Sequence, residues 1–402
     1  MTSNRSLLFL TYMGMVFIGL SFATTGALLP AIITDLDLRL SEAGVLVAAI
    51  SAGFLTSVLL SNYLVTVLRR KQMLIFGLFS MILGATTFGI GPLLVLNALF
   101  GFLIGFGAGL IEIPLNAITI DLYMEKRSSG LNLLHMFFGV GAILGPKYAS
   151  TLLAWTDHWR SAYLSNGILF GVLLVLFAFQ RLPSPLHRDQ RSGLPDHASA
   201  PRFHPLRHPT LLLLGLAVTL GVGTEVGINR WLTTYLKFSF SSSIDQAADS
   251  LLVYWIGMTL GRFLLSQIIH RVRFRYETLL QIVIGVGIVT LSLGLTVPDQ
   301  GFATLWFFVT GLCMAGIVPL SLALGSDIHP ERPDEMTSVL YTSFAFGGTF
   351  SPWLISIIAE ATDIRIGMFL SVPLLVVMLV IIQWVRTRSM RERESPSSTR
   401  SS

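Results

Sequence analysis

The chain repeats a spaced set of residues after about half its length, inside segments that are unusually long and apolar. Leu134, Phe138, Gly141, Pro146 and Ser150 reappear 206 positions later as Leu340, Phe344, Gly347, Pro352 and Ser356. This period is far beyond the roughly 20–50 residues of solenoid repeats. Repeats of several spans each are instead found in membrane proteins. The sequence therefore predicts two copies of one membrane unit.

Composition supports a location in lipid. Hydrophobic residues make up 53% of the chain and charged residues only 12%, against about 25% charged residues in soluble domains. A helix needs about 20 apolar residues to cross a bilayer, and the apolar runs predict twelve such spans. They cover residues 7–33, 43–68, 72–90, 92–121, 129–155, 161–180, 209–236, 247–269, 277–297, 301–327, 335–360 and 365–386.

The predicted fold is an all-α membrane protein with two pseudo-symmetric six-helix bundles, residues 1–180 and 209–386. Residues 181–208 between them are rich in Pro, Arg and His, which is typical of a flexible linker. The spacing of the histidines around prolines favours a solvated linker over a metal site. Residues 387–402 are rich in Arg, Glu and Ser and are predicted to be a disordered tail.

Basic residues predict the orientation. Twenty Lys and Arg residues lie on the side of the two termini, and four lie on the opposite side: Arg39, Arg160, Lys237 and Arg365. This bias places both termini in the cytoplasm of a protein of the inner or plasma membrane. The net charge of +5 is then a topology signal, and no nucleic-acid partner is expected. With one cysteine and no nucleophile, phosphate or metal motif, the chain is predicted to be no enzyme and to need no cofactor.

The candidate functional residues are the polar side chains within the predicted spans, because such side chains are unfavourable in contact with lipid. In the span 92–121, one helical face carries Gly105, Ala108, Gly109, Glu112, Asn116 and Thr119. An ionised carboxylate without a partner is costly in a membrane, so Glu112 is expected to exchange a proton and could carry it. The structural alternative is a neutral Glu that hydrogen-bonds between helices. The position of Glu112 near mid-span favours the functional interpretation.

The seventh span, 209–236, carries a second polar and aromatic group: Glu225, Asn229, Arg230, Trp231 and Tyr235. Carboxylate and amide groups can bind sugar hydroxyls, and an aromatic face can cover sugar C–H groups. The structural alternative is a salt bridge from Glu225 to Arg230 or Arg262. Glu225 and Arg230 lie about 140° apart around a helix, which disfavours the first pair. For Arg230, the functional and structural interpretations stay equally open.

The span 129–155 carries a third face: Asn132, His135, Gly139, Ala142 and Pro146. His135 could relay protons with Glu112, because His titrates closest to neutrality. The alternative is a hydrogen-bonded interface residue. In the second repeat Tyr341 takes the position of His135. We therefore count Asn132 and Tyr341, together with Asn116, among the candidates for substrate binding.

These residues resemble a known family. Twelve spans in two halves with a central loop resemble the Major Facilitator Superfamily. More narrowly, three stretches are similar to the fucose–galactose–glucose:proton symporter family, in particular its glucose/mannose branch: Gly107 to Glu112, Phe137 to Ala142, and Gly223 to Gly227 followed by Trp231 and Tyr235. Fucose permeases carry an Asp just before the segment corresponding to residues 26–30, and an Asn at the position of Phe138. This chain has neither, so fucose is disfavoured, and Phe138 becomes a candidate substrate contact.

The resemblance implies a proton-coupled hexose symporter that works by alternating access, with Glu112 as the family's membrane carboxylate. We expect a monomer in the bilayer, with proton coupling at Glu112 and His135. One alternative is a proton-coupled multidrug or metabolite exporter that uses the same carboxylates. Another is a receptor or scaffold without transport activity, which the presence of both Glu112 and Glu225 disfavours.

Overall fold

The computed structural model describes residues 2–123, 127–180, 182, 209–271, 275–328 and 333–394, and these residues form helices and no strands. The helices are α1 (Thr2–Asp35), α2 (Leu40–Val67), α3 (Arg70–Thr87), α4 (Leu94–Leu122), α5 (Arg127–Thr156), α6 (Arg160–Phe179), α7 (Pro209–Phe240), α8 (Ile244–Arg271), α9 (Tyr276–Thr296), α10 (Gln300–Met314), α11 (Ile317–Ile328), α12 (Pro333–Ala361), α13 (Ile364–Phe369) and α14 (Ser371–Glu394). The all-helical fold predicted from the sequence is confirmed.

Eleven helical stretches are long and apolar enough to cross a membrane. Two of them join consecutive helices, α10 with α11 and α13 with α14. The remaining long helix, α3, begins with the charged residues Arg70 and Lys71. Together these segments follow the twelve predicted spans closely, because each apolar run ends at charged residues or at a turn.

Two predicted spans are interrupted, and the last helix is longer than expected. The span 301–327 is divided at Ala315 and Gly316, and the span 365–386 is divided at Leu370. Helix α14 continues to Glu394, so the predicted disorder does not begin at 387. Arg, Glu and Met have high helix propensity and extend the helix beyond its apolar part. The predicted linker, apart from Leu182, and residues 395–402 lie outside the described residues.

The chain divides into two compact units that do not follow the sequence halves strictly. Unit 1 comprises Met1–Phe203 with Arg230–Leu252, and unit 2 comprises His204–Asn229 with Val253–Ser402. The end of α7 and the start of α8 therefore pack in unit 1. One contact that joins the end of α7 to unit 1 is a hydrogen bond from Arg230 to the carbonyl of Phe22. The periodicity of the sequence does not predict this contact.

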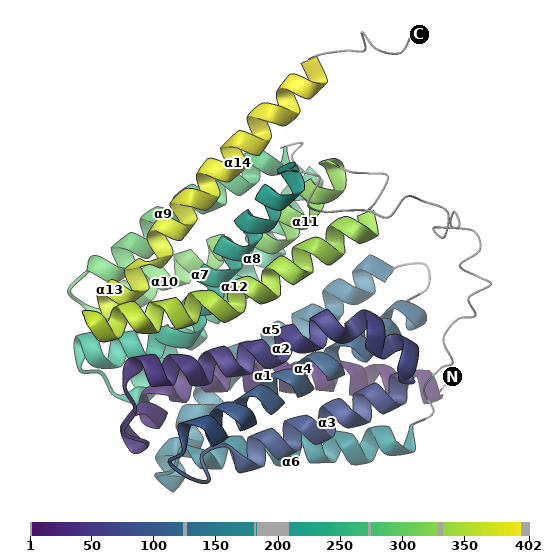
Figure 1. The fold of residues 1–402 in the computed structure, drawn as a ribbon, viewed down its shortest axis with the longest axis vertical. Helices are drawn as coiled ribbons and strands as arrows, with labels where there is room; N and C mark the ends of the chain where they lie inside the picture. Colours follow the sequence, from purple (N-terminus) through teal and green to yellow (C-terminus); the bar gives the residue numbers. More distant parts are fainter. Residues whose placement is uncertain are drawn as a thin grey trace. The chain divides into compact units, whose positions relative to one another are not determined.

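In unit 1, α1 crosses α5 and α2 crosses α4 at glycines. A Cβ atom at Gly141 would lie 1.9 Å from the carbonyl oxygen of Val16, and one at Gly105 would lie 1.7 Å from that of Ile50. Only glycine allows backbones to approach this closely, as is common between membrane helices. Helix α3 packs beside α6 in the same unit (Figure 1).

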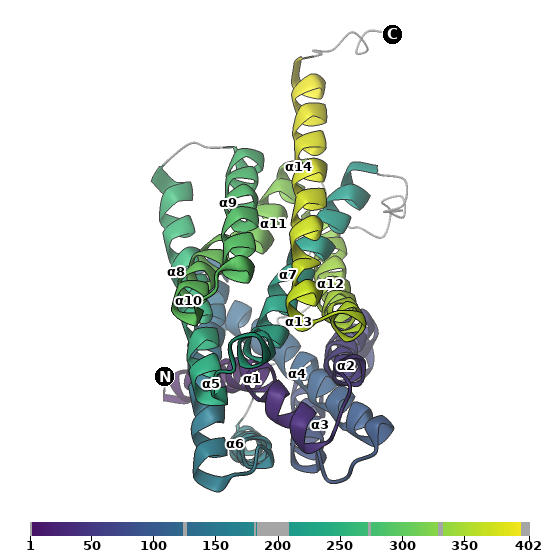
Figure 2. The same cartoon turned by 90° about the vertical axis from the view of Figure 1, so that its left-hand side faces the viewer.

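Unit 2 repeats both crossings. A Cβ atom at Gly347 of α12 would lie 2.2 Å from the carbonyl oxygen of Thr219 in α7, and one at Gly311 of α10 would lie 2.4 Å from that of Tyr254 in α8. Gly347 is the predicted repeat partner of Gly141, so the internal repeat is visible in backbone contacts. In this unit α9 packs against α14 (Figure 1) and against α10 (Figure 2).

Candidate functional site

Glu112 lies on α4 two residues before Pro114. Proline has no N–H to donate to the carbonyl of Leu110, so the helix is weakened beside the carboxylate. Leu110 and Pro114 are buried, whereas Glu112 and Asn116 are partly accessible. The Asn116 side chain is the polar neighbour of the Glu112 carboxylate. An amide neighbour can bond to either protonation state of a carboxyl group and does not hold it ionised as a cation would.

The residues of the single face predicted for α4 have different environments in the structure. Gly109 lies against α2, where a Cβ atom would come within 1.7 Å of the Ser57 hydroxyl oxygen. Thr119 is buried and donates its hydroxyl proton within its own helix. Glu112 and Asn116 are thus the polar pair on α4 that stays partly accessible.

The α5 candidates differ in exposure. Asn132 is exposed, and His135 and Phe138 are partly buried. The Phe138 ring lies 5.8 Å from the Phe22 ring of α1, measured between centroids. The relay between His135 and Glu112 stays a prediction.

Glu225 and Asn229 lie one turn apart on α7, and both are buried. A carboxylate oxygen of Glu225 is 3.9 Å from Nη2 of Arg262 on α8. Of the two partners that the sequence left open, the structure selects Arg262. Neither amide atom of Asn229 has a hydrogen-bond partner among the described residues, and the same holds for the buried hydroxyl of Tyr254, which lies near Glu225. Unpaired buried polar atoms cost about 1–3 kcal/mol each, so this group suits a polar ligand.

The two aromatic candidates of α7 belong to the core in this conformation. Trp231 and Tyr235 are both 0% exposed. The Tyr235 ring packs edge-on against Phe240, with 5.7 Å between centroids. Their rings therefore stabilise the packing of unit 1, and their contact with substrate stays a prediction.

Arg230 contacts a residue that sequence reasoning missed. Its guanidinium donates to the carbonyl oxygen of Phe22 at 2.9 Å, and its Cζ lies 4.3 Å from the Phe22 ring centroid. The structure relates this position to the second half of the chain. Val16 in α1 and Thr219 in α7 make equivalent contacts at the two crossings, and Phe22 and Glu225 follow them by the same number of residues. Phe22 is thus the counterpart of Glu225 in the first half.

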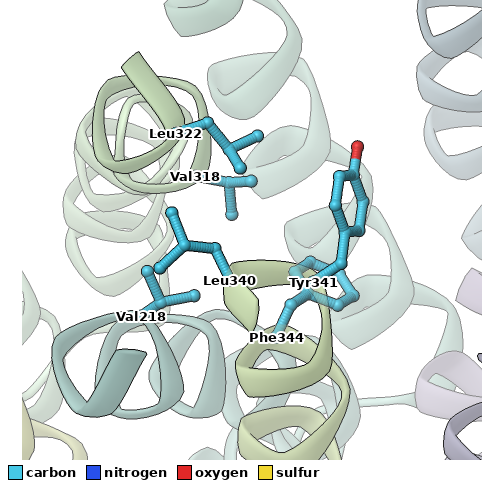
Figure 3. A pocket seen from close by; sticks show the side chains of 6 residues that line it. All are labelled: Val218, Val318, Leu322, Leu340, Tyr341 and Phe344. Carbon is cyan, nitrogen blue, oxygen red and sulfur yellow. The ribbon is translucent and has the colours of Figure 1, made fainter. Parts of the chain in front are cut away.

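Unit 2 has a pocket at the positions equivalent to the polar pair of unit 1. It is lined by Val218, Val318, Leu322, Leu340, Tyr341 and Phe344, and the aliphatic side chains of α11 face Leu340 across it (Figure 3). Tyr341 is the repeat partner of His135. Gly105 and Gly311 occupy equivalent positions at the two crossings, and the same displacement along the sequence relates Glu112 to Val318. Unit 2 therefore has an aliphatic side chain where unit 1 has its candidate proton carrier.

Comparisons with known proteins agree with this architecture. A curated relative, Protein TsgA homolog of Yersinia pestis (strain Pestoides F), is 22% identical over 329 residues, which are 81% of each chain. A bacterial homolog of the human lysosomal transporter Spinster, solved inward-facing and unoccupied, has a TM-score of 0.81 at 16% identity and covers 98% of this chain and 99% of its own. A D-xylose–proton symporter has a TM-score of 0.71 at 14% identity, with 95% and 97% covered.

The likeness to these solved structures shows the fold alone. The family model described as Major Facilitator Superfamily matches residues 11–308 and 281–401, which together span nearly the whole chain. Its members are transporters of small molecules rather than enzymes. The chain therefore belongs to the Major Facilitator Superfamily and is a multi-pass membrane transporter.

Proposed function

We propose that this transporter is a proton-coupled monosaccharide symporter of the cell membrane, with both termini in the cytoplasm. The observation that carries the proposal is the environment of Glu112, a carboxylate inside a membrane span beside an amide. Among the ion pairs of the described residues, none includes Glu112. In apolar surroundings such a carboxylate is more stable when neutral. Glu112 is therefore the proposed acceptor of the coupling proton, and His135 is its proposed relay.

Sugar recognition is proposed for the Asn side chains and the accessible rings. Asn229 offers an unpaired donor and an unpaired acceptor beside Glu225, and Asn116 offers an unpaired oxygen. Sugar hydroxyls both donate and accept, so they suit each of these atoms. The partly accessible Phe138 and the exposed Tyr341 can cover the C–H groups of a sugar ring. Asn132, which is exposed, is a further proposed contact.

The neighbour named as a D-xylose–proton symporter shares the fold. Because one fold hosts many substrates, that likeness does not identify the sugar for this chain. The membrane carboxylate and the unpaired amides support the proposal more directly, together with the sequence motifs that resemble the glucose/mannose branch. A screen of the purified protein tests it, because ligand binding to the native state raises the melting temperature. We expect hexoses to raise it, whereas a rise with lipophilic cations alone would favour an exporter.

Replacing Asn229 with Ala is expected to weaken hexose binding by roughly 1–3 kcal/mol, because the sugar hydroxyls then lose their buried partners. Isothermal titration with D-glucose and D-mannose measures the loss. Ser292→Ala is the control, since that hydroxyl donates to the Ile288 carbonyl of its own helix at 2.7 Å. Tight binding of a lipophilic cation, no heat with either hexose and no effect of Asn229→Ala would contradict sugar recognition.

A further inference from the structure

Arg230 is a buried cation without a carboxylate partner among the described residues. Its side chain is 1% exposed, and none of the ion pairs found in the described part of the chain includes it. One Nη1–H donates to the carbonyl of Phe22, whereas the Nε–H has no partner. Taking a cation out of water costs several kcal/mol unless an anion compensates for the lost hydration. The described residues do not supply that anion.

The other two basic residues that the sequence places inside spans contrast with Arg230. Lys147 pairs with Asp245 at 3.0 Å, and Arg262 lies 3.9 Å from Glu225. Each of these charges has an acid within the chain. Of these three basic residues, Arg230 alone has no acidic partner among the described residues, although its side chain is far more buried than that of Lys147 or Arg262.

The open edge of the guanidinium is the edge that best suits a carboxylate. Phe22 covers one flat face of the group, and Nη1 is engaged by the Phe22 carbonyl. The remaining side-on edge contains Nε and Nη2, whose parallel N–H bonds match the two oxygens of a carboxylate. The donor at Nε is unpaired in the described structure. An anionic ligand could therefore bind there without breaking the bond from Nη1 to Phe22.

Neutral hydroxyl groups lie close to the same guanidinium. Tyr163 lies near Arg230 and donates to Thr25 at 3.2 Å, and all three side chains are buried. Thr234 follows Arg230 by one helical turn, and its buried hydroxyl has no hydrogen-bond partner among the described residues. A ligand that carries hydroxyls as well as a negative charge would find partners of both kinds here.

We infer that Arg230 binds the carboxylate of the substrate, and that the substrate is a sugar acid such as a hexuronate. The inference rests on the proposed sugar transport and narrows its substrate class. It also completes the charge balance of unit 1: a proton neutralises Glu112, and the substrate carboxylate neutralises Arg230. One proton moving with one monoanion transfers no net charge, so neither Glu112 nor Arg230 carries an uncompensated charge in the loaded protein.

Counterflow in proteoliposomes tests the inference with three labelled probes: D-glucuronate, D-glucose and lactate. The wild type is expected to prefer D-glucuronate over D-glucose by about tenfold or more, the size of a charge-assisted hydrogen bond. Arg230→Gln should lose this preference. Arg230→Lys should keep part of the preference, because Lys retains the positive charge but not the two parallel N–H donors of the guanidinium. Arg160→Gln is the matched control: Arg160 lies over the Trp159 ring but pairs with Asp35 at 2.8 Å, so the preference should not change.

The outcomes separate this inference from the proposed function. Preference for D-glucose in the wild type would overturn the inference and leave sugar symport intact, whether or not the variants fold. Unchanged preference for D-glucuronate in Arg230→Gln would also overturn it. Transport of lactate that depends on Arg230, with neither sugar transported, would overturn both the sugar-acid substrate and the proposed sugar function, and would leave only an anion site at Arg230.

Discussion

Glu112→Gln is expected to abolish proton-driven accumulation of the transported sugar while counterflow continues near the wild-type rate. Gln keeps the shape of the side chain and its capacity to form hydrogen bonds, but it cannot take up a proton. An imposed pH gradient across proteoliposomes measures the effect. The wild type should concentrate labelled sugar, whereas the variant should only equilibrate it. This is the largest functional change that we expect from any single substitution.

Glu42→Gln is the control for Glu112→Gln. Glu42 is in the first turn of α2 and pairs with Arg39 at 3.1 Å, so its loss should leave accumulation unchanged. If Glu112→Gln still accumulated sugar against its gradient, another group would carry the coupling proton. Glu225 would then be the next candidate, because it is the other carboxylate that we propose as a functional group within a membrane span.

Gly105→Ala is expected to cause the largest loss of stability. The new Cβ atom would lie 1.7 Å from the carbonyl oxygen of Ile50, so α2 and α4 would have to move apart. Overpacking of this kind costs about 1–3 kcal/mol, and more where the obstructing atom is backbone. We expect the apparent melting temperature in detergent to fall markedly. It is measured as the temperature at which the monodisperse peak of the protein is lost after heating.

Gly171→Ala provides the matched control within a helix. Nothing lies within 4 Å of a Cβ atom built at Gly171 of α6, and Ala favours a helix over Gly by roughly 0.5–1 kcal/mol. The melting temperature of this variant should stay the same or rise. Equal melting temperatures of Gly105→Ala and Gly171→Ala would show that α2 and α4 can move apart at little cost in stability.

Much of the fold could be predicted because the apolar core of a bilayer permits few backbone structures. A membrane span must be helical and apolar, so its ends lie where charge or turn residues begin. Hydropathy does not record interruptions inside an apolar run, which is why the breaks at Gly316 and Leu370 were not predicted. It also carries no information on partners, so the packing of Arg230 against Phe22 in unit 1 could not be predicted either.

The candidate site was predictable where it depends on helical spacing and unpredictable where it depends on packing. Glu112 and Asn116 lie one turn apart, and the structure brings their side chains together. Gly109, on the same predicted face, is used for contact with α2 instead. The rings of Trp231 and Tyr235 fill the core, because sequence alone does not distinguish an aromatic side chain that packs from one that faces a ligand.

The most direct test of proton coupling is to measure proton movement while sugar enters. Proteoliposomes containing an internal pH indicator would receive D-glucuronate and, separately, D-glucose from outside, with labelled uptake recorded in parallel. With proton-coupled symport, entry of the transported sugar acidifies the interior, and Glu112→Gln abolishes the acidification while labelled sugar still exchanges. Entry of labelled sugar with no change in internal pH, or with the interior becoming more alkaline, would contradict proton-coupled symport.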